Sequence, residues 1–337
     1  MRLRPRGKGL GKVNILYIDA NGTTSDSYMY RYYGDLLREI KKTETVYLVE
    51  GIIQDMSDFL GKINVSIDLI IYGLGYFAQN TPEAFKKITG LAETDIPVFC
   101  LIHKPQSMLD EKLNFCKINK VDLLIDSQEH NYKKYGEIAG VPSHRSFFTA
   151  TPKIFYPRGV EKIYDIGFSG ALHGLNPDGS NKIKGETANL RERVSNIISN
   201  NKYNVFWNSS NSLDYRIHND EEYATRMNEC KVWLSTTGPL LDIGPRYFEA
   251  ALSKTLIFCN NMPEQYGDLF IDGRTCVTFE NDLSNFEEKL DFYLSDDNER
   301  NRIIDNAYDL ISQNYTWKHM ADNIINKAKE IICLSNP

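Results

Sequence analysis

Residues 244–259 read GPRYFEAALSKTLIFC, a short helical segment that runs directly into an apolar strand. Pro245 suits the first turn of a helix, where its missing N–H has no helical partner to lose. Arg246 and Glu249 then lie three residues apart on one helical face. The run TLIFC is typical of a buried strand. A helix that leads straight into a buried strand indicates a parallel α/β sheet.

The same alternation of apolar runs and amphipathic segments extends to both sides of this stretch. In the N-terminal half we expect strands at VNILYID, TVYLVE, IDLIIYG, IPVFCLI, VDLLID and SFFTA, and helices over 31–41, 82–89, 107–118 and 129–138. In the C-terminal half we expect strands at YDIGFSG, YNVFWN, CKVWLST, TLIFC and CVTF, and helices over 188–199, 220–228 and 246–252. The pattern predicts an α/β protein with two tandem, Rossmann-like domains.

The chain between the two series contains prolines that interrupt both helix and sheet, in TATPKIFYPRGVEKI. From Leu283 onward only helical patterns follow, and the last helix can return to the first domain. We therefore predict a basic tail over 1–12, a first domain over 13–155, a second over 160–313 and a returning C-terminal helix over 314–337.

Composition excludes several classes of protein. No apolar run approaches the roughly 20 residues needed to cross a bilayer, and the start MRLRPRGKGLGK lacks the apolar segment of a signal peptide. The 6 cysteines show no CxxC spacing, which predicts no metal site and fits a reducing compartment. We expect a cytoplasmic protein.

The net charge of -6 argues against a surface that embraces nucleic acid, so no nucleic-acid partner is expected. One basic cluster stands out near the N-terminus, made of Arg2, Arg4, Arg6, Lys8 and Lys12. It predicts weak peripheral contact with anionic lipid headgroups or with a polyanionic acceptor. A solvated, frayed tail is the alternative.

Two facing α/β domains create a central cleft lined by the carboxyl ends of both sheets, where such sheets bind ligands. Helix N-termini at these ends suit a diphosphate. A helical face with Arg246 and Glu249 can hold a phosphate and a ribose together. The alternative for this pair is an ordinary surface ion pair of little energetic weight.

The second half resembles group 1 glycosyltransferases of the GT-B fold, and looks most like the subfamily of spore-maturation glycosyltransferase-like proteins. The resemblance is carried, in order, by YDIGFSG, NLRERVSNII, YATRMNECKVWLSTT, GPRYFEAALSKTLIFC and YTWKHMADNII. It covers residues 164 to about 325, and the N-terminal half only in architecture. It implies a donor-binding second domain, an acceptor-side first domain and a C-terminal helical segment that packs back on the first domain.

The resemblance also implies roles for single residues. The donor-binding set it points to is Ser169, Gly170, Arg191, Gly244, Arg246, Tyr247 and Glu249. Glu249 would bind the ribose hydroxyls and Arg246 would lie near the diphosphate, while Gly170 leaves room for the phosphates. Arg191 is favoured as the second phosphate-neutralising residue, with Lys182, Lys184 and Arg193 as alternatives. The donor would be a UDP-sugar, or else a GDP-sugar, with no further cofactor.

Four residues are catalytic candidates. Related retaining enzymes place a histidine at a strand end against the donor sugar, and His103 in VFCLIHKP is the counterpart, although a strand-end histidine is often structural. Asp242 could contact the sugar, because Leu241 stands where many retaining members carry an acidic residue. Asp19 or Asp26 could serve as the base of an inverting mechanism.

The loop after the first predicted strand suits the acceptor side, with Asn21, Gly22, Thr23 and Thr24 as contacts, or it is an ordinary capped helix start. The chain contains no Asp-x-Asp triplet, so we expect transfer without a metal ion. The sequence thus predicts metal-independent transfer of a hexose, with retention favoured, from a nucleotide sugar to a hydroxyl of a glycan or glycoconjugate. The alternatives are a nucleotide-sugar epimerase, a non-catalytic nucleotide-sugar-binding module and a glucosyltransferase for modified DNA bases.

Overall fold

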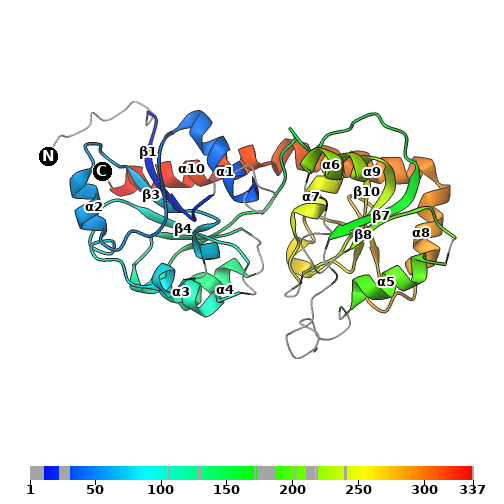
Figure 1. The fold of residues 1–337 in the computed structure, drawn as a ribbon, viewed down its shortest axis with the longest axis horizontal. Coiled ribbons are helices and arrows are strands. Elements are labelled where there is room, and N and C mark those ends of the chain that lie inside the picture. Colours follow the sequence, from blue (N-terminus) through cyan, green and yellow to red (C-terminus); the bar gives the residue numbers. More distant parts are fainter. Residues whose placement is uncertain are drawn as a thin grey trace. The chain divides into compact units, whose positions relative to one another are not determined.

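The computed structural model describes residues 11–22, 31–79, 81–104, 107–127, 131–170, 172, 187, 189–200, 202–209, 217, 219–238 and 241–335. The chain forms two compact units, each a parallel sheet flanked by helices (Figure 1). The first unit combines Met1–Phe147 with Trp317–Pro337, and the second is Phe148–Thr316. The predicted α/β fold with two Rossmann-like sheets is confirmed.

The sheet of the first unit has the strand order β2-β1-β3-β4-β5-β6, with neighbouring strands parallel. The strands are β1 (Asn14–Asp19), β2 (Thr45–Glu50), β3 (Leu69–Tyr72), β4 (Val98–Ile102), β5 (Leu123–Asp126) and β6 (Ser143–Arg145). The connecting helices are α1 (Arg31–Thr43), α2 (Met56–Lys62), α3 (Leu109–Ile118) and α4 (Tyr132–Ala139). The strand order reverses at β1 and β3, which makes the carboxyl ends of these strands the favoured ligand position.

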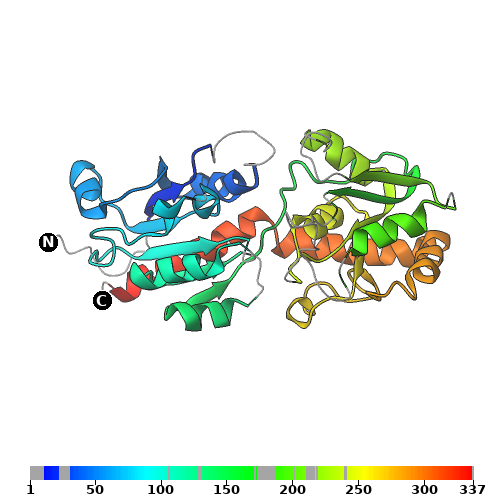
Figure 2. The ribbon, with the colours of Figure 1, turned by 60° about the horizontal axis from the view of Figure 1, so that its bottom comes forward.

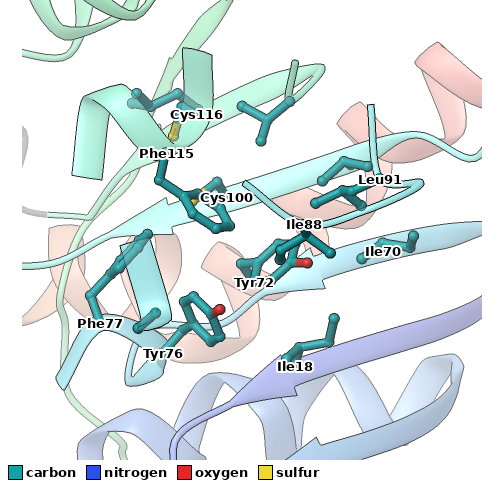
Figure 3. Close-up of a cluster of buried hydrophobic side chains, with 14 of the residues drawn as sticks. Ile18, Ile70, Tyr72, Tyr76, Phe77, Ile88, Leu91, Cys100, Phe115 and Cys116 are labelled. Carbon is teal, nitrogen blue, oxygen red and sulfur yellow. The ribbon is translucent and has the colours of Figure 1, made fainter. Parts of the chain in front are cut away.

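One side of this sheet carries an aromatic core, which Figure 3 shows from close by. Tyr72 of β3 packs edge-on against Tyr76 of the 3-10 helix η1 (Tyr76–Gln79), with ring centroids 4.8 Å apart. The ring of Phe115, on α3, also packs edge-on against Tyr72, with centroids 5.1 Å apart. Ile18 and Ile70 extend the cluster from β1 and β3. The apolar strand runs noted in the sequence therefore form the interior of the unit, and the hydrophobic effect holds its layers together.

The second sheet has the order β11-β10-β9-β7-β8, again with parallel neighbours. Its strands are β7 (Tyr164–Gly170), β8 (Val205–Ser209), β9 (Cys230–Ser235), β10 (Leu256–Asn260) and β11 (Val277–Phe279). Its helices are α5 (Leu190–Ile198), α6 (Asp220–Asn228), α7 (Pro245–Leu252), α8 (Phe286–Ser295) and α9 (Asp297–Asn314). Here the strand order reverses at β7, between β8 and β9.

The final helix α10 (Trp317–Ser335) returns to the first unit and packs along α1, as Figure 2 shows for the red and dark blue helices. Lys329 donates to Glu44 at 2.8 Å, and the other carboxylate oxygen of Glu44 accepts the backbone N–H of Val13 at 2.6 Å. The pair ties α10 to the start of β1. Within the described ranges, no helix is long and apolar enough to cross a membrane.

Two predicted elements of the first unit were wrong, and one helix was not predicted. The run SFFTA is not a strand, because Phe147 and Phe148 are buried in irregular backbone and the edge strand β6 lies just before them. The polar Ser-His-Arg of β6 gave no apolar signal. Helix α2 was not predicted, although Asp55 caps it by accepting the N–H of Asp58. Residues 82–89 contain only the 3-10 helix η2 (Pro82–Phe85).

Candidate functional site

The carboxyl edge of the second sheet gathers polar groups where the strand order reverses. Strand β7 ends at Ser169 and Gly170, and the neighbouring strand β9 ends at Ser235 and is followed by Thr236. Parallel strands bring these ends to the same edge of the sheet. An edge of this kind, at a reversal of strand order, is the usual ligand position in open α/β sheets.

At this edge, two arginine side chains from different helices each lie close to the same aromatic ring. The guanidinium carbon of Arg191, on α5, lies 5.4 Å from the centroid of the Phe168 ring, and that of Arg246, on α7, lies 5.2 Å from it. The Nε of Arg191 donates to the hydroxyl of Thr236 at 2.7 Å, and Nη2 of Arg246 donates to the carbonyl of Ser169 at 2.9 Å. The ring and these oxygens hold two positive charges beside the same aromatic side chain at the sheet edge, an arrangement that suits a multiply charged anion.

Gly170 makes room for one of these charges. A Cβ placed on Gly170 would lie 2.4 Å from Nη2 of Arg246, and the glycine has a φ of +154°, which side-chain-bearing residues rarely adopt. The turn after β7 therefore accepts the guanidinium only because residue 170 has no side chain.

Gly170→Ala is expected to displace the Arg246 guanidinium, the mobile end of a flexible side chain, and also to lower stability, because alanine is strained at a φ of +154°. Binding of an anionic ligand should weaken by roughly tenfold, as for one lost charge-assisted bond. The matched control is Gly167→Ala in the same strand, whose Cβ would lie 2.6 Å from the buried Trp233 ring. That variant should lose about 2 kcal/mol or more of unfolding free energy, since overpacking a core is costly.

Thermal melting and anion titration of both glycine variants separate the two roles. The assignment is contradicted if Gly170→Ala binds the anion as well as the parent chain.

Glu249 lies on the buried side of α7. Only 1% of it is exposed, and its Oε2 accepts a hydrogen bond from the hydroxyl of Tyr223 at 3.0 Å. Because the Glu249 carboxylate is buried, it is not part of an ordinary surface ion pair with Arg246. Helix α7 starts at Pro245, as predicted, with Gly244 in an extended conformation at its N-cap. Arg246 and Glu249 thus occupy the first two turns of one helix, next to the end of β7.

The turn between β9 and α7 holds the remaining candidates of this unit. The N–H of Gly238 donates to the carbonyl of Asp242 at 2.7 Å, and the N–H of Leu241 donates to the carbonyl of Gly238 at 3.1 Å. Asp242 is buried, whereas Leu241 is 43% exposed with a positive φ of 62°. Tyr247 is fully buried against Phe270, so its side chain belongs to the core of the unit.

The first unit places Asp19 and Asn21 at the end of β1. Asp19 is fully buried, and its Oδ1 accepts the N–H of Ala20 at 2.8 Å. A Cβ on Gly73, just after β3, would lie 2.3 Å from Oδ2 of Asp19. Asp19 is therefore packed inside the turn. Gly22 follows with a φ of +85°, typical of a tight turn.

Three further candidates of this loop, Thr23, Thr24 and Asp26, lie outside the described residues, as do Lys182 and Lys184. The same holds for Arg2, Arg4, Arg6 and Lys8 of the basic cluster.

His103 follows β4 and is buried. Its ring meets that of Tyr33 edge-on, with centroids 5.5 Å apart. Burial, and then the charges of Lys104 and Lys112, hold the pKa of His103 well below its ordinary value, so the imidazole is neutral at neutral pH. A neutral imidazole can donate or accept a hydrogen bond to a hydroxyl.

Lys112 holds the backbone around His103. Its ammonium group donates to the carbonyls of His103 at 2.8 Å and of Lys104 at 2.9 Å. Burial is the main cause that lowers the pKa of Lys112 to about 8.

The sequence analysis missed four residues that shape these sites: Phe168, Thr236, Tyr223 and Lys112. Phe168 and Thr236 were within quoted segments, and only their position at strand ends could have indicated them. Tyr223 acts on Glu249, 26 residues further along the chain, and Lys112 acts on the carbonyls of His103 and Lys104, 9 and 8 residues before it; neither contact has a local signal in the sequence. Among the described residues, no group of three or more His, Cys, Asp or Glu could hold a metal ion.

Comparison with solved structures identifies the class of fold. HepE from Anabaena in complex with UDP superposes with a TM-score of 0.55 at 14% identity, over 94% of this chain and 100% of that chain. HepE with UDP-glucose gives the same score and identity, over 94% and 99%. Sucrose-phosphate synthase from Thermosynechococcus elongatus gives 0.59 at 10% identity, over 96% and 100%. The chain has the GT-B fold.

A sequence match narrows this class for part of the chain. Residues 186–326 match the family described as glycosyl transferase-like. The match covers Arg191, Arg246 and Glu249 together with most of the second unit. No curated protein matches the chain by sequence.

Proposed function

We propose that this chain is a glycosyltransferase that moves a hexose from a nucleotide-diphosphate sugar to a hydroxyl of a glycan or glycoconjugate. The observation that carries the proposal is the pair of guanidiniums of Arg191 and Arg246 around Phe168, with Glu249 on the same helix as Arg246. Two fixed positive charges suit a diphosphate, and a carboxylate suits the ribose diol. UDP-sugars are favoured over GDP-sugars, since HepE was solved with UDP and with UDP-glucose.

In the proposed reaction the bond between the sugar C1 and the diphosphate oxygen breaks, and C1 bonds to the acceptor oxygen. Arg191 and Arg246 stabilise the negative charge that develops on the departing diphosphate, which is the largest contribution that the protein makes. As the acceptor hydroxyl attacks, its proton passes to the departing diphosphate oxygen, which keeps the step balanced. Retention at C1 remains the favoured outcome.

The catalytic candidates take different parts in this proposal. His103, neutral at the end of β4, hydrogen-bonds a hydroxyl of the donor sugar, and Asp242 is a second sugar contact. Asp19 is assigned to the turn after β1, because it is buried and accepts the N–H of Ala20. A buried carboxylate in that position is a poor base for an incoming hydroxyl.

The remaining assignments complete the proposal. The second unit binds the donor, and the first unit, with Asn21 and Gly22, lies on the acceptor side. The segments quoted above favour the spore-maturation glycosyltransferase-like subfamily, acting in the cytoplasm.

Transfer or donor hydrolysis is expected to persist in excess EDTA. The chain contains no Asp-x-Asp triplet, and two guanidiniums can neutralise the diphosphate in place of a divalent cation. Release of UDP from UDP-glucose, measured with and without EDTA, checks this. Complete loss of turnover that manganese or magnesium restores would contradict metal independence.

A further inference from the structure

The hydroxyl of Tyr223 hydrogen-bonds the carboxylate that the proposed function assigns to the ribose. It donates to Oε2 of Glu249 at 3.0 Å, and the two residues are 5% and 1% exposed. Tyr223 lies on α6 and Glu249 on α7, so the bond joins two helices. A buried hydrogen bond to a charged acceptor is stronger than a neutral one, because no water competes for the partners.

The position of the Tyr223 hydroxyl is itself fixed by rigid surroundings. Its ring packs edge-on against Phe155, with centroids 5.9 Å apart, and against Trp233 at 5.8 Å. The Trp233 ring in turn lies against Gly167, where a Cβ would come within 2.6 Å of it. Helix α6 is anchored at its start by Asn219, whose side chain accepts the N–H groups of Glu221 and Glu222. The packing of the ring and the anchored helix therefore restrict where the Tyr223 hydroxyl can lie.

A glutamate side chain has three rotatable bonds, and its carboxylate can accept several hydrogen bonds at once. The bond from Tyr223 restricts this freedom before any ligand arrives. Preorganisation of this kind raises affinity, because the ordering cost is met in the free protein.

We propose that Tyr223 is a positioning residue that holds the Glu249 carboxylate in the orientation that accepts the ribose hydroxyls of the donor. The inference rests on the proposed function, in which Glu249 binds ribose. Tyr223 does not touch the ligand in this account and acts through Glu249.

The test is a calorimetric titration of UDP and of pyrophosphate into the full chain and its variants. Tyr223→Phe keeps the ring between Phe155 and Trp233 and removes only the hydroxyl. We expect it to bind UDP roughly three- to tenfold more weakly, and to bind pyrophosphate like the parent. In a Glu249→Ala background, which lacks the carboxylate that Tyr223 holds, the same change should add less than a further twofold, since residues that act as a unit are not additive.

A matched control is present in the same unit. The hydroxyl of Tyr203 donates to Oδ1 of Asp291 at 2.9 Å, near the protein surface. Tyr203→Phe also removes a bond from a tyrosine to a carboxylate and should leave UDP binding unchanged. Melting of each variant reports any general loss of stability.

The outcomes separate the two levels of the account. If Glu249→Gln loses UDP affinity while Tyr223→Phe binds UDP like the parent, the positioning role is wrong and the proposed function stands. Losses that multiply in the double variant also overturn the positioning role. If the parent chain binds neither UDP nor another nucleoside diphosphate, the proposed function fails, and the inference fails with it.

Discussion

Replacing Arg191 and Arg246 together by methionine is expected to weaken UDP binding by about a hundredfold to ten-thousandfold. Each guanidinium can form charge-assisted bonds to the diphosphate, worth about 1.5–3 kcal/mol apiece. Affinity for uridine, which has no phosphates, should change little. Each single variant should bind UDP about ten- to a hundredfold more weakly than the parent, unless the two charges share one phosphate oxygen.

Arg226→Met is the control for this prediction. The guanidinium of Arg226 also lies over a phenylalanine ring, that of Phe206 at 5.8 Å, in the same unit, but it pairs with Glu229 at 3.0 Å. Its loss should leave UDP affinity unchanged. Fluorescence or calorimetric titration with UDP and uridine measures all variants alike. If the Arg191/Arg246 double variant binds UDP within twofold of the parent, the anion site lies elsewhere.

The sequence predicted most of the fold because buried parallel strands are continuous apolar runs. The runs VNILYID and TLIFC each contain a strand, β1 and β10, and α6 spans the predicted residues 220–228. The strand prediction was wrong where buried apolar residues lie outside strands and where a strand is polar. Phe147 and Phe148 are buried in a segment without regular secondary structure. Strand β6 is polar because it is a half-buried edge strand.

The candidate site was only partly visible in the sequence. The spacing of Arg246 and Glu249 put both on one helix, and the structure has them on α7. The sequence could not show that Glu249 faces inward to Tyr223, since the partner helix is set by tertiary packing. Likewise the sequence could not show that Arg191 of α5 and Arg246 of α7 both lie close to the ring of Phe168, because tertiary packing sets these contacts.

Glu249→Gln is the second change with a large expected effect. Glutamine keeps the shape of the side chain, and its amide oxygen can still accept from Tyr223. It removes the charge, so the bonds to the ribose hydroxyls weaken by about 1.5–3 kcal/mol, or roughly ten- to a hundredfold in UDP affinity. Pyrophosphate affinity should change little, because the two arginines are untouched. This pattern is the reverse of the one expected for the arginine variants.

The most direct measurement is a calorimetric titration of UDP into the parent chain and into Glu249→Gln, with EDTA present and melting temperatures recorded. The account predicts saturable binding to the parent and affinity at least tenfold weaker for the variant. It is contradicted if the parent does not bind UDP or any other nucleoside diphosphate, or if Glu249→Gln binds UDP like the parent and differs only in its melting temperature.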